Sequence, residues 1–273
     1  MAITSRDPGL AGTELVTSAY EPFARFYDRF TSDYAYEHWM DGVDRWARGQ
    51  GLRGRDLLDV ACGTGKSFEP MLDRGYTVTA CDISPAMVAE AHRKHGSRAE
   101  VFIADMRRLP WRERFDLVTC MDDAVNYLLD DDDLLAALAS MRRALRPGGI
   151  AVFDTNSLAT YRTTFADTFE VRSGDTLFRW SGEGSSDFES GSLASATIEI
   201  VAPDAPTESW HVQRHWSVER IRAACEEAGF GSVSFRGQAS GCHLRGDPDE
   251  ERHIKIVCLA AKSRHEGKEE AWS

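Results

Sequence analysis

The sequence predicts an α/β protein with a doubly wound, mostly parallel sheet of seven strands and an inserted antiparallel β element after the fifth strand. Short β-rich runs alternate with longer helical patterns over residues 56–154, which is typical of βαβ units. Residues 169–200 instead alternate apolar and polar side chains around several glycines, as an antiparallel sheet does. The helical pattern returns at residues 217–228, so the first pattern is expected to continue after the insertion.

Composition narrows the class of protein and its partners. The 273 residues are 42% hydrophobic and 28% charged, which fits a packed globular protein. The net charge of -12 disfavours nucleic acid and anionic membrane as partners, and the arginine pair Arg107-Arg108 is interpreted as solvated surface. No apolar run reaches membrane-helix length and no signal peptide is visible, so a cytoplasmic location is expected. The six cysteines form no C-x-x-C pair, and no metal site is expected.

Residues 1–50 are expected to form an N-terminal tail and a helical lid. The stretch 1–15 has few apolar anchors and contains Pro8 and Gly9, which is typical of a loose tail. Between Ala19 and Gly49, apolar and aromatic residues recur at three- and four-residue steps. This spacing predicts two amphipathic helices ahead of the main domain.

Residues 51–160 are expected to form the ligand-binding core. Pro147-Gly148-Gly149 predicts the end of the last helix before the fifth strand. In chain order we expect strands at 56–60, 77–81, 99–103, 115–121 and 150–153, with helices at 67–74, 85–95 and 134–145.

The remaining chain is expected to insert a sheet and then complete the core. Residues 161–216 are predicted to form the inserted antiparallel sheet, serving as a substrate cover or dimer element. In the completing segment 217–262, Ser217 is a predicted N-cap, without a capping box because Arg220 occupies the N3 position. Gly229 closes that helix, and strands are expected near 232–236 and 254–260. Residues 263–273 form a polar tail.

A strand–loop–helix element at residues 57–67 provides the first sign of a ligand site. Gly63 and Gly65 lack Cβ atoms, so the loop after the first strand can turn tightly and its backbone can approach a ligand. Asp82 ends the second strand, where a carboxylate can accept hydrogen bonds from both hydroxyls of a ribose. A glycine pair alone is a weak signal. Asp82 could also be a cap of the helix that begins at Pro85, and both roles could hold at once.

Further motifs follow in order, and all lie between residues 56 and 154. The five motifs are Leu58–Gly65, Cys81–Met87, Ala104–Met106, Phe115–Met121 and Leu145–Gly149. Together they resemble the class I S-adenosylmethionine-dependent methyltransferase family, of the small-molecule type that includes sugar N,N-dimethyltransferases. Five motifs in one order are more specific than any single motif. The resemblance implies a Rossmann-like sheet and S-adenosylmethionine as the cofactor.

The resemblance implies a role for each matching position. Asp59 and the backbone from Ala61 through Gly63 to Gly65 would hold the methionine part of the cofactor, and Asp82 the ribose. Ile83 and Met87 would lie against the adenine face, although Met87 could equally be ordinary helix core, and Asp105 with the Met106 amide would bind the adenine edge. Met121 is a further candidate for cofactor binding.

Two other nucleotide sites fit the sequence less well. An NAD fingerprint needs a third glycine, but Phe68 occupies its place after Gly63 and Gly65. A P-loop needs a glycine where Val60 lies, although Gly65-Lys66-Ser67 matches its ending. An NAD-dependent oxidoreductase is therefore the least favoured alternative.

Residues outside these motifs provide candidates for the lid and the acceptor site. The stretches 26–30 and 34–39 resemble the lid region of small-molecule methyltransferases, which makes Tyr20, Tyr27 and Trp39 lid candidates. The segment after the fourth strand departs from the N-P-P-Y motif of amine-selective nucleic-acid and glutamine enzymes, so small acceptors are favoured. Candidate substrate contacts are Asp122, Asp123, Asn126 and Tyr127, although an acidic pair before a helix is as often a cap.

The inserted segment adds candidates for catalysis. A histidine can serve as a base because its ordinary pKa is near 6.5. His211 and His215 of this segment are therefore catalytic candidates, with ordinary hydrogen-bonded residues as the competing interpretation. Tyr27 of the lid region is a third catalytic candidate. Trp180, Trp210, Arg214 and Trp216 are further candidates for the pocket wall.

The predicted function is methyl transfer from S-adenosylmethionine to nitrogen or oxygen of a small metabolite, in keeping with secondary metabolism. The leaving group is already activated, so the protein must mainly align the reactants and exclude water. A carbon acceptor and a cofactor-binding module without turnover are the alternatives. The acceptor and the oligomeric state, including a homodimer, are left open by the sequence.

Overall fold

The computed structural model describes residues 12–203 and 206–264. Two expected tails therefore fall largely outside the described residues, at 1–11 and 265–273. Helix α1 (Gly12–Phe30) begins inside the stretch predicted as loose tail, because Val16 and Ala19 continue its apolar face. No helix in the described part of the chain is long and apolar enough to cross a membrane.

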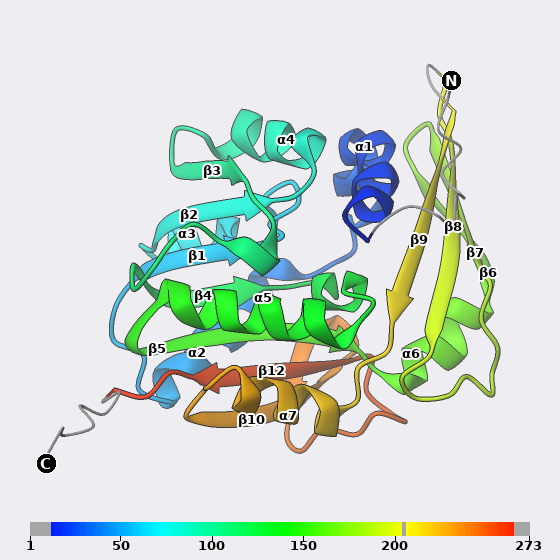
Figure 1. The fold of residues 1–273 in the computed structure, drawn as a ribbon. Helices are drawn as coiled ribbons and strands as arrows, with labels where there is room; N and C mark the ends of the chain where they lie inside the picture. The colour runs from blue at the N-terminus through cyan, green and yellow to red at the C-terminus, as the bar shows by residue number, and fades with distance from the viewer. Residues whose placement is uncertain (1–11, 204–205, 265–273) are drawn as a thin grey trace, which may run out of the picture.

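The central sheet is mostly parallel and has eight strands in the order β11-β10-β12-β5-β4-β1-β2-β3 (Figure 1). Its parallel neighbours are strands β1 to β5, while β10, β11 and β12 pair antiparallel. The seven predicted strands are all present, and the three-residue β11 adds an unpredicted edge. The bounds are β1 Asp56–Val60, β2 Thr77–Asp82, β3 Ala99–Ile103, β4 Phe115–Cys120, β5 Leu145–Asn156, β10 Ser232–Ala239, β11 His243–Arg245 and β12 Lys255–Ala261.

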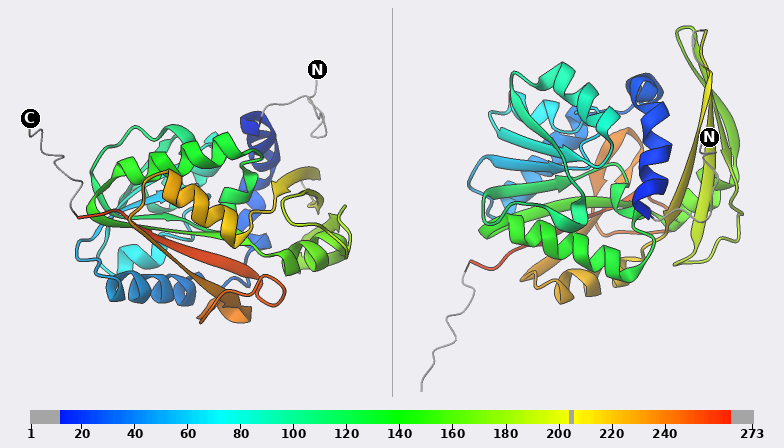
Figure 2. Two further views of the ribbon diagram at one scale, coloured as in Figure 1. Left: turned by 60° about the horizontal axis from the view of Figure 1, so that its bottom comes forward. Right: turned by 45° about the horizontal axis from the view of Figure 1, so that its top comes forward.

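Helices cover both faces of this sheet, as a doubly wound fold requires. On one face α5 (Asp131–Ala144) and α7 (Val218–Glu227) pack against the sheet, burying Leu138 and Ile221. On the other face α2 (Tyr36–Gly49) and α3 (Glu69–Asp73) do the same, burying Trp46 and Met71 (Figure 2). Helix α4 (Pro85–His95) follows β2 and contributes Ala91 to the second cluster. The unpredicted helix α6 spans Leu158–Thr163, and the short 3-10 helices are η1 Met106–Arg108, η2 Ala124–Tyr127, η3 Thr164–Ala166 and η4 Ser240–Cys242.

Polar side chains fix several helix ends near the ligand side. Ser84 caps α4, because its hydroxyl accepts a hydrogen bond from the Met87 amide at 3.2 Å. Ser217 caps α7 in the same way through the Arg220 amide at 3.2 Å, which confirms the predicted N-cap. The alternative that Asp82 serves as the cap of α4 is wrong, since Ser84 has that role.

The insertion is a four-stranded antiparallel sheet in the order β6-β7-β8-β9. Helix α1 stands between this sheet and the central sheet (Figure 1). Phe23 and Phe26 of α1 pack against Phe178 and Ile198 of the inserted sheet. The insertion therefore supports α1 from behind. Its strands are β6 Thr168–Ser173, β7 Thr176–Gly182, β8 Leu193–Val201 and β9 Thr207–Arg214.

Candidate active site

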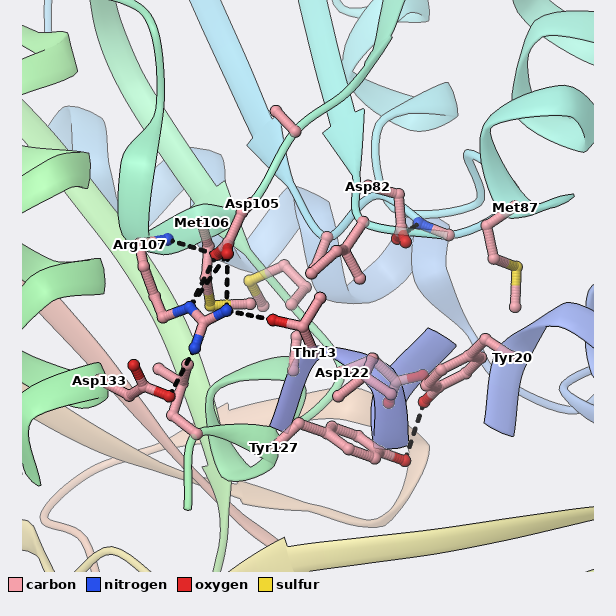
Figure 3. A pocket seen from close by; sticks show the side chains of 18 of the residues that line it. Thr13, Tyr20, Asp82, Met87, Asp105, Met106, Arg107, Asp122, Tyr127 and Asp133 are labelled. Carbon is pink, nitrogen blue, oxygen red and sulfur yellow. Dashed lines mark hydrogen bonds and ion pairs between the residues drawn. The ribbon is translucent and has the colours of Figure 1, made fainter. Parts of the chain in front are cut away.

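One cavity of about 790 Å³ opens at the carboxyl ends of β1, β2, β3 and β4, where open α/β sheets bind ligands (Figure 3). Helix α1 closes it from the side opposite these strand ends through Thr13, Val16, Tyr20 and Tyr27. Twelve of the predicted site residues line it, namely Tyr20, Tyr27, Ala61, Gly63, Asp82, Ile83, Met87, Asp105, Met106, Met121, Asp122 and Tyr127.

The loop after β1 is held by the carboxylate that ends β2. Asp82 accepts a hydrogen bond from the Gly63 amide at 2.8 Å and another from the Ser84 amide at 2.9 Å. Burial raises the pKa of Asp82, while these backbone amides partly offset the rise. Ala61 has a φ of 53°, a left-handed conformation that costs energy for any residue other than glycine. The loop is thus tied to the second strand at the point where both line the cavity.

Arg107 lies at the far end of the cavity from the lid tyrosines. Its guanidinium forms ion pairs of 2.7 Å with Asp105 and with Asp133, and it donates a hydrogen bond to Thr13 of α1 (Figure 3). Burial alone would raise the pKa of Asp105, but the hydrogen bonds from Arg107 lower it. The interpretation of Arg107 as solvated surface is wrong, because its side chain is 20% exposed and lines the cavity. Asp105 is a near neighbour in the sequence, but Asp133 and Thr13 lie 26 and 94 positions from Arg107, so no local pattern could have revealed these two contacts.

Asp122 dominates the opposite end of the cavity. Its carboxylate accepts hydrogen bonds from the Tyr27 hydroxyl at 2.9 Å and the Tyr36 hydroxyl at 2.8 Å. The Lys255 ammonium donates to it at 2.8 Å. Burial works against the charged form, but Lys255 and the phenols lower the pKa of Asp122 on balance. An ionised carboxylate held by two phenol hydroxyls and an ammonium group therefore lines the cavity.

Lys255 joins Asp122 to two more carboxyl groups. It is 3% exposed, forms an ion pair with Asp154 at 3.1 Å, and also bonds Asp123. Burial raises the pKa of Asp123 to about 6, and only part of this rise is offset by Lys255. Sequence reasoning missed Lys255, which lies in an apolar strand and would have been noticed only as a charge within that run.

The backbone beneath this cluster is strained. Asp122 and Asp123 have φ values of 64° and 54°, and their amides donate to the Asp154 carboxylate at 2.6 and 2.9 Å. Asp123 makes no side-chain cap to η2, so the capping alternative for this pair is wrong. The two hydrogen bonds to Asp154 hold the backbone in this conformation, in which the Asp122 side chain lines the cavity.

Three phenol and imidazole side chains form a chain beside Asp122. The Tyr20 hydroxyl donates to the Tyr127 oxygen at 2.9 Å, and that oxygen lies 2.8 Å from His211 Nδ1. Tyr20 and Tyr127 line the cavity, whereas His211 is 3% exposed and lies behind them on β9. Burial lowers the pKa of His211 to about 4, so the imidazole is neutral near pH 7. The predicted catalytic His211 thus reaches the cavity only through Tyr127.

Several predicted residues lie outside the cavity lining. Asp59 is fully buried and accepts hydrogen bonds from Ser67 at 2.6 Å and Thr119 at 2.5 Å. Trp39 is fully buried in the core with Lys255 over its ring, and Asn126 holds the Arg214 carbonyl at 2.7 Å. Gly65 supports the loop where a Cβ would meet His95 at 2.6 Å. Their predicted ligand contacts stay predictions.

Most of the inserted-sheet candidates also lie elsewhere. His215 packs among Tyr161 and Phe188, and its Nδ1 lies 3.2 Å from the Ser190 hydroxyl. Burial lowers the pKa of His215 to about 4. The described residues of the insertion contribute no side chain to the cavity wall; this applies to Trp180, Trp210, Arg214 and Trp216 as well.

Comparisons with known proteins agree with this geometry. A family model described as a methyltransferase domain matches residues 57–149. A putative methyltransferase of Geobacillus sp. (strain WCH70) is 30% identical over 167 residues, covering 59% of this chain and 68% of that protein. The dTDP-4-amino-2,3,4,6-tetradeoxy-D-glucose N,N-dimethyltransferase of Saccharopolyspora spinosa is 34% identical over 143 residues, covering 50% of this chain and 56% of that protein.

Among solved structures, the fold matches an S-adenosylmethionine-dependent methyltransferase from Clostridium acetobutylicum ATCC 824. The TM-score is 0.74 at 25% identity, and the match covers 89% of this chain and 99% of that one. The strand order, the cavity at the carboxyl ends and the matched domain all point the same way. The chain therefore belongs to the S-adenosylmethionine-dependent methyltransferase family and is an enzyme of that class.

Proposed function

We propose that this enzyme methylates a nitrogen or oxygen atom of a small metabolite that binds at the Asp122 end of the cavity. The observation that carries the proposal is that one cavity has Asp82 and Asp105 along the side formed by the strand ends and Asp122, Tyr20 and Tyr127 along the facing side (Figure 3). A donor and an acceptor bound at these two ends would be aligned and shielded from water by α1.

The first end of the cavity fits S-adenosylmethionine. Asp82 can accept from the ribose hydroxyls with the lone pairs that its two backbone amides leave free. Ile83 and Met87 offer an apolar face to the adenine. When bound, S-adenosylmethionine supplies an activated methyl group. In this proposal residues 51–160 and 217–262 hold the cofactor, while residues 12–50 and the insertion cover it.

The second end fits an acceptor that carries polar hydrogens. The Asp122 carboxylate and the phenols offer lone pairs to an N–H or O–H group, and the carboxylate also attracts a protonated amine. A carbon acceptor offers fewer such hydrogens. The name of the Saccharopolyspora relative, an amino-sugar N,N-dimethyltransferase, supports nitrogen. In the described residues no group of three or more His, Cys, Asp or Glu side chains is arranged so that it could hold a metal ion, and the chemistry requires none.

Two further features accompany the proposal. A homodimer through the outer face of the inserted sheet has little support, because Arg179 there pairs with Glu170 at 2.8 Å and Glu199 at 3.0 Å across the strands. The six cysteines are unpaired and buried, which supports a reducing compartment such as the cytoplasm.

Calorimetry with S-adenosylmethionine tests the cofactor end. Asp82→Ala is expected to weaken binding about a hundredfold, because two charge-assisted hydrogen bonds to the ribose are lost. Asp132→Asn, which changes an exposed carboxylate at the start of α5, serves as the control and should bind like the wild type. Unchanged affinity in a folded Asp82→Ala protein would refute the role of Asp82.

Incubation with a panel of small amines, alcohols and phenols tests the acceptor end. Mass spectrometry should find a methyl group on nitrogen or oxygen, and S-adenosylhomocysteine should form in step with it. A product methylated on carbon would contradict the proposal. Formation of no S-adenosylhomocysteine with any acceptor would favour a binding module without turnover.

A further inference from the structure

A closed chain of hydrogen bonds runs from the cavity into the inserted sheet and back to α1. From Tyr20 it passes to Tyr127 at 2.9 Å and to His211 Nδ1 at 2.8 Å. His211 Nε2 lies 2.7 Å from the Ser209 hydroxyl, which in turn lies 2.7 Å from the Ala19 carbonyl. Ala19 precedes Tyr20 in α1, so β9 and the lid helix are joined at both ends of the chain.

The Ala19 carbonyl fixes the donor and the acceptor of every hydrogen bond in this series. A carbonyl oxygen can only accept, so the single hydrogen of Ser209 points to Ala19. Ser209 must then accept from His211, which places the imidazole hydrogen on Nε2. Because burial keeps the pKa of His211 near 4, the ring carries only that one hydrogen at neutral pH.

The hydrogen-bond directions are fixed in the same way from His211 towards the cavity. His211 Nδ1 has no hydrogen and accepts from Tyr127. The Tyr127 oxygen then accepts the hydrogen of Tyr20. The hydroxyl hydrogen of Tyr20 is thereby committed, and the Tyr20 oxygen has only lone pairs left for a ligand.

We propose that His211 is a positioning residue that, through Tyr127, turns the hydroxyl hydrogen of Tyr20 away from the methyl acceptor. Tyr20 then accepts from an N–H or O–H group of the acceptor and does not donate to the acceptor's lone pair. The proposal rests on the proposed function, because it concerns how the acceptor is held.

The arrangement matters for methyl transfer. The acceptor atom attacks the methyl group with its lone pair, so a hydrogen bond donated to that lone pair would withhold it from the reaction. A Tyr20 that only accepts holds the acceptor by its hydrogen and leaves the lone pair free to face the donor. The inserted sheet thus takes part in catalysis through His211, although its described side chains do not line the cavity.

Nitrogen NMR of the histidine side chains in the full chain tests the first step without any acceptor. His211, assigned by the signal that disappears in His211→Leu, should carry its hydrogen on Nε2 and have an unprotonated Nδ1 at pH 7. A hydrogen on Nδ1, or a doubly protonated ring, overturns the proposal whether or not an acceptor is known.

Kinetics of four variants test the second step. His211→Leu should lower kcat about tenfold and leave the affinity for S-adenosylmethionine within about twofold, because only the acceptor end loses a hydrogen bond. His211→Asn should recover most of the rate, since its side-chain oxygen can accept from Tyr127. Tyr127→Phe should resemble His211→Leu, and the double variant should be no slower than Tyr127→Phe, because both changes break one chain.

His215→Leu is the matched control. His215 is also buried and neutral in the same part of the chain, but it lies outside the cavity among Tyr161 and Phe188. Its replacement should leave kcat unchanged in the folded protein.

An equal loss of kcat in His215→Leu, a full loss in His211→Asn, or additive losses in the double variant would show that His211 only stabilises the fold. Unchanged kcat in His211→Leu would also overturn the proposal, while unchanged cofactor binding in Asp82→Ala would refute the proposed donor site alone.

Discussion

The two ends of the cavity are built in different ways. At the cofactor end, the loop after β1 and Asp82 come from consecutive strand ends, and their mutual contact is a backbone hydrogen bond of 2.8 Å. At the acceptor end, Asp122 is held by Tyr27 from α1, Tyr36 from α2 and Lys255 from β12. One end depends on neighbouring motifs, and the other depends on segments brought together by the whole fold.

The difference shows where substrate choice can change in such a protein. The cofactor end can be kept by conserving a few short motifs, whereas the acceptor end can be altered by changes in α1, in β12 or in the insertion behind them. The contrast also extends to charge. Buried groups at the acceptor end form a network of several ionisable residues around Lys255, while the isolated Asp59 lies beneath the cofactor end.

Removing the central cation should have the largest effect on stability. Lys255→Met leaves Asp122, Asp123 and Asp154 buried without their counter-charge, which should cost about 3–5 kcal/mol of unfolding free energy. Urea denaturation at pH 7 measures this cost. Arg93→Met, which removes an exposed ion pair with Glu90, is the control and should change stability by about 0.5 kcal/mol or less. A similar small change in Lys255→Met would show that the carboxyls simply take up protons.

His215, one of the two buried histidines of the insertion, should make stability depend on pH in one direction. Burial, with a smaller effect from Arg162, lowers the pKa of His215 from 6.5 to about 4, so the unfolded chain binds a proton that the folded protein does not. This contribution is complete above pH 6.5 and is lost as the pH falls to 4, by about 3 kcal/mol in total. The unfolding free energy of His215→Leu, measured from pH 4 to 7, should lack this component. Parallel curves for wild type and variant would contradict it.

The carboxyl beneath the cofactor loop should act in the opposite direction and slightly less strongly. Burial raises the pKa of Asp59 from 3.8 to about 6, because the hydrogen bonds from Ser67 and Thr119 offset only part of the desolvation. The folded protein therefore keeps a proton that the unfolded chain releases, and this stability is lost as the pH rises from 4 to 6. Asp59→Asn should gain stability relative to wild type over that range, by up to about 3 kcal/mol. Chemical denaturation at several pH values would reveal a constant difference if Asp59 were ionised throughout.

The contact between Arg107 and Thr13 of the lid helix α1 should have the smallest effect on stability. Thr13→Val removes the hydroxyl that accepts from Arg107, which should cost about 1 kcal/mol locally. Hydrogen exchange should become faster in the first turn of α1 and stay unchanged in β1. Thr17→Val, which loses only a hydrogen bond to the Thr13 carbonyl within the helix, is the matched control. Equal exchange in both variants would mean that Arg107 does not anchor the lid.

Much of the cofactor end could be predicted from the sequence. The glycine loop, Asp82 and Asp105 follow strands that each read as a short β-rich run, and parallel strand ends meet at one edge of a sheet. The inserted sheet was also predictable, because its residues alternate with period two. The bounds of α1 were missed at the start, since Gly12 and Thr13 carry no helical signal of their own.

The contacts at the acceptor end could not be predicted from the sequence. The sequence alone determined the fold class, the position of the insertion and the residues of the strand ends that line the cavity, because these depend on local periodicity and on short motifs. Only the tertiary structure decided that Lys255 pairs with Asp122, that Arg107 joins Asp105 to the lid, and that His211 lies behind Tyr127. The contacts of Lys255 with Asp122, of Arg107 with Thr13 and of His211 with Tyr127 join residues 84 to 133 positions apart. Their energy depends on burial and hydrogen-bond direction that exist only once the elements have packed.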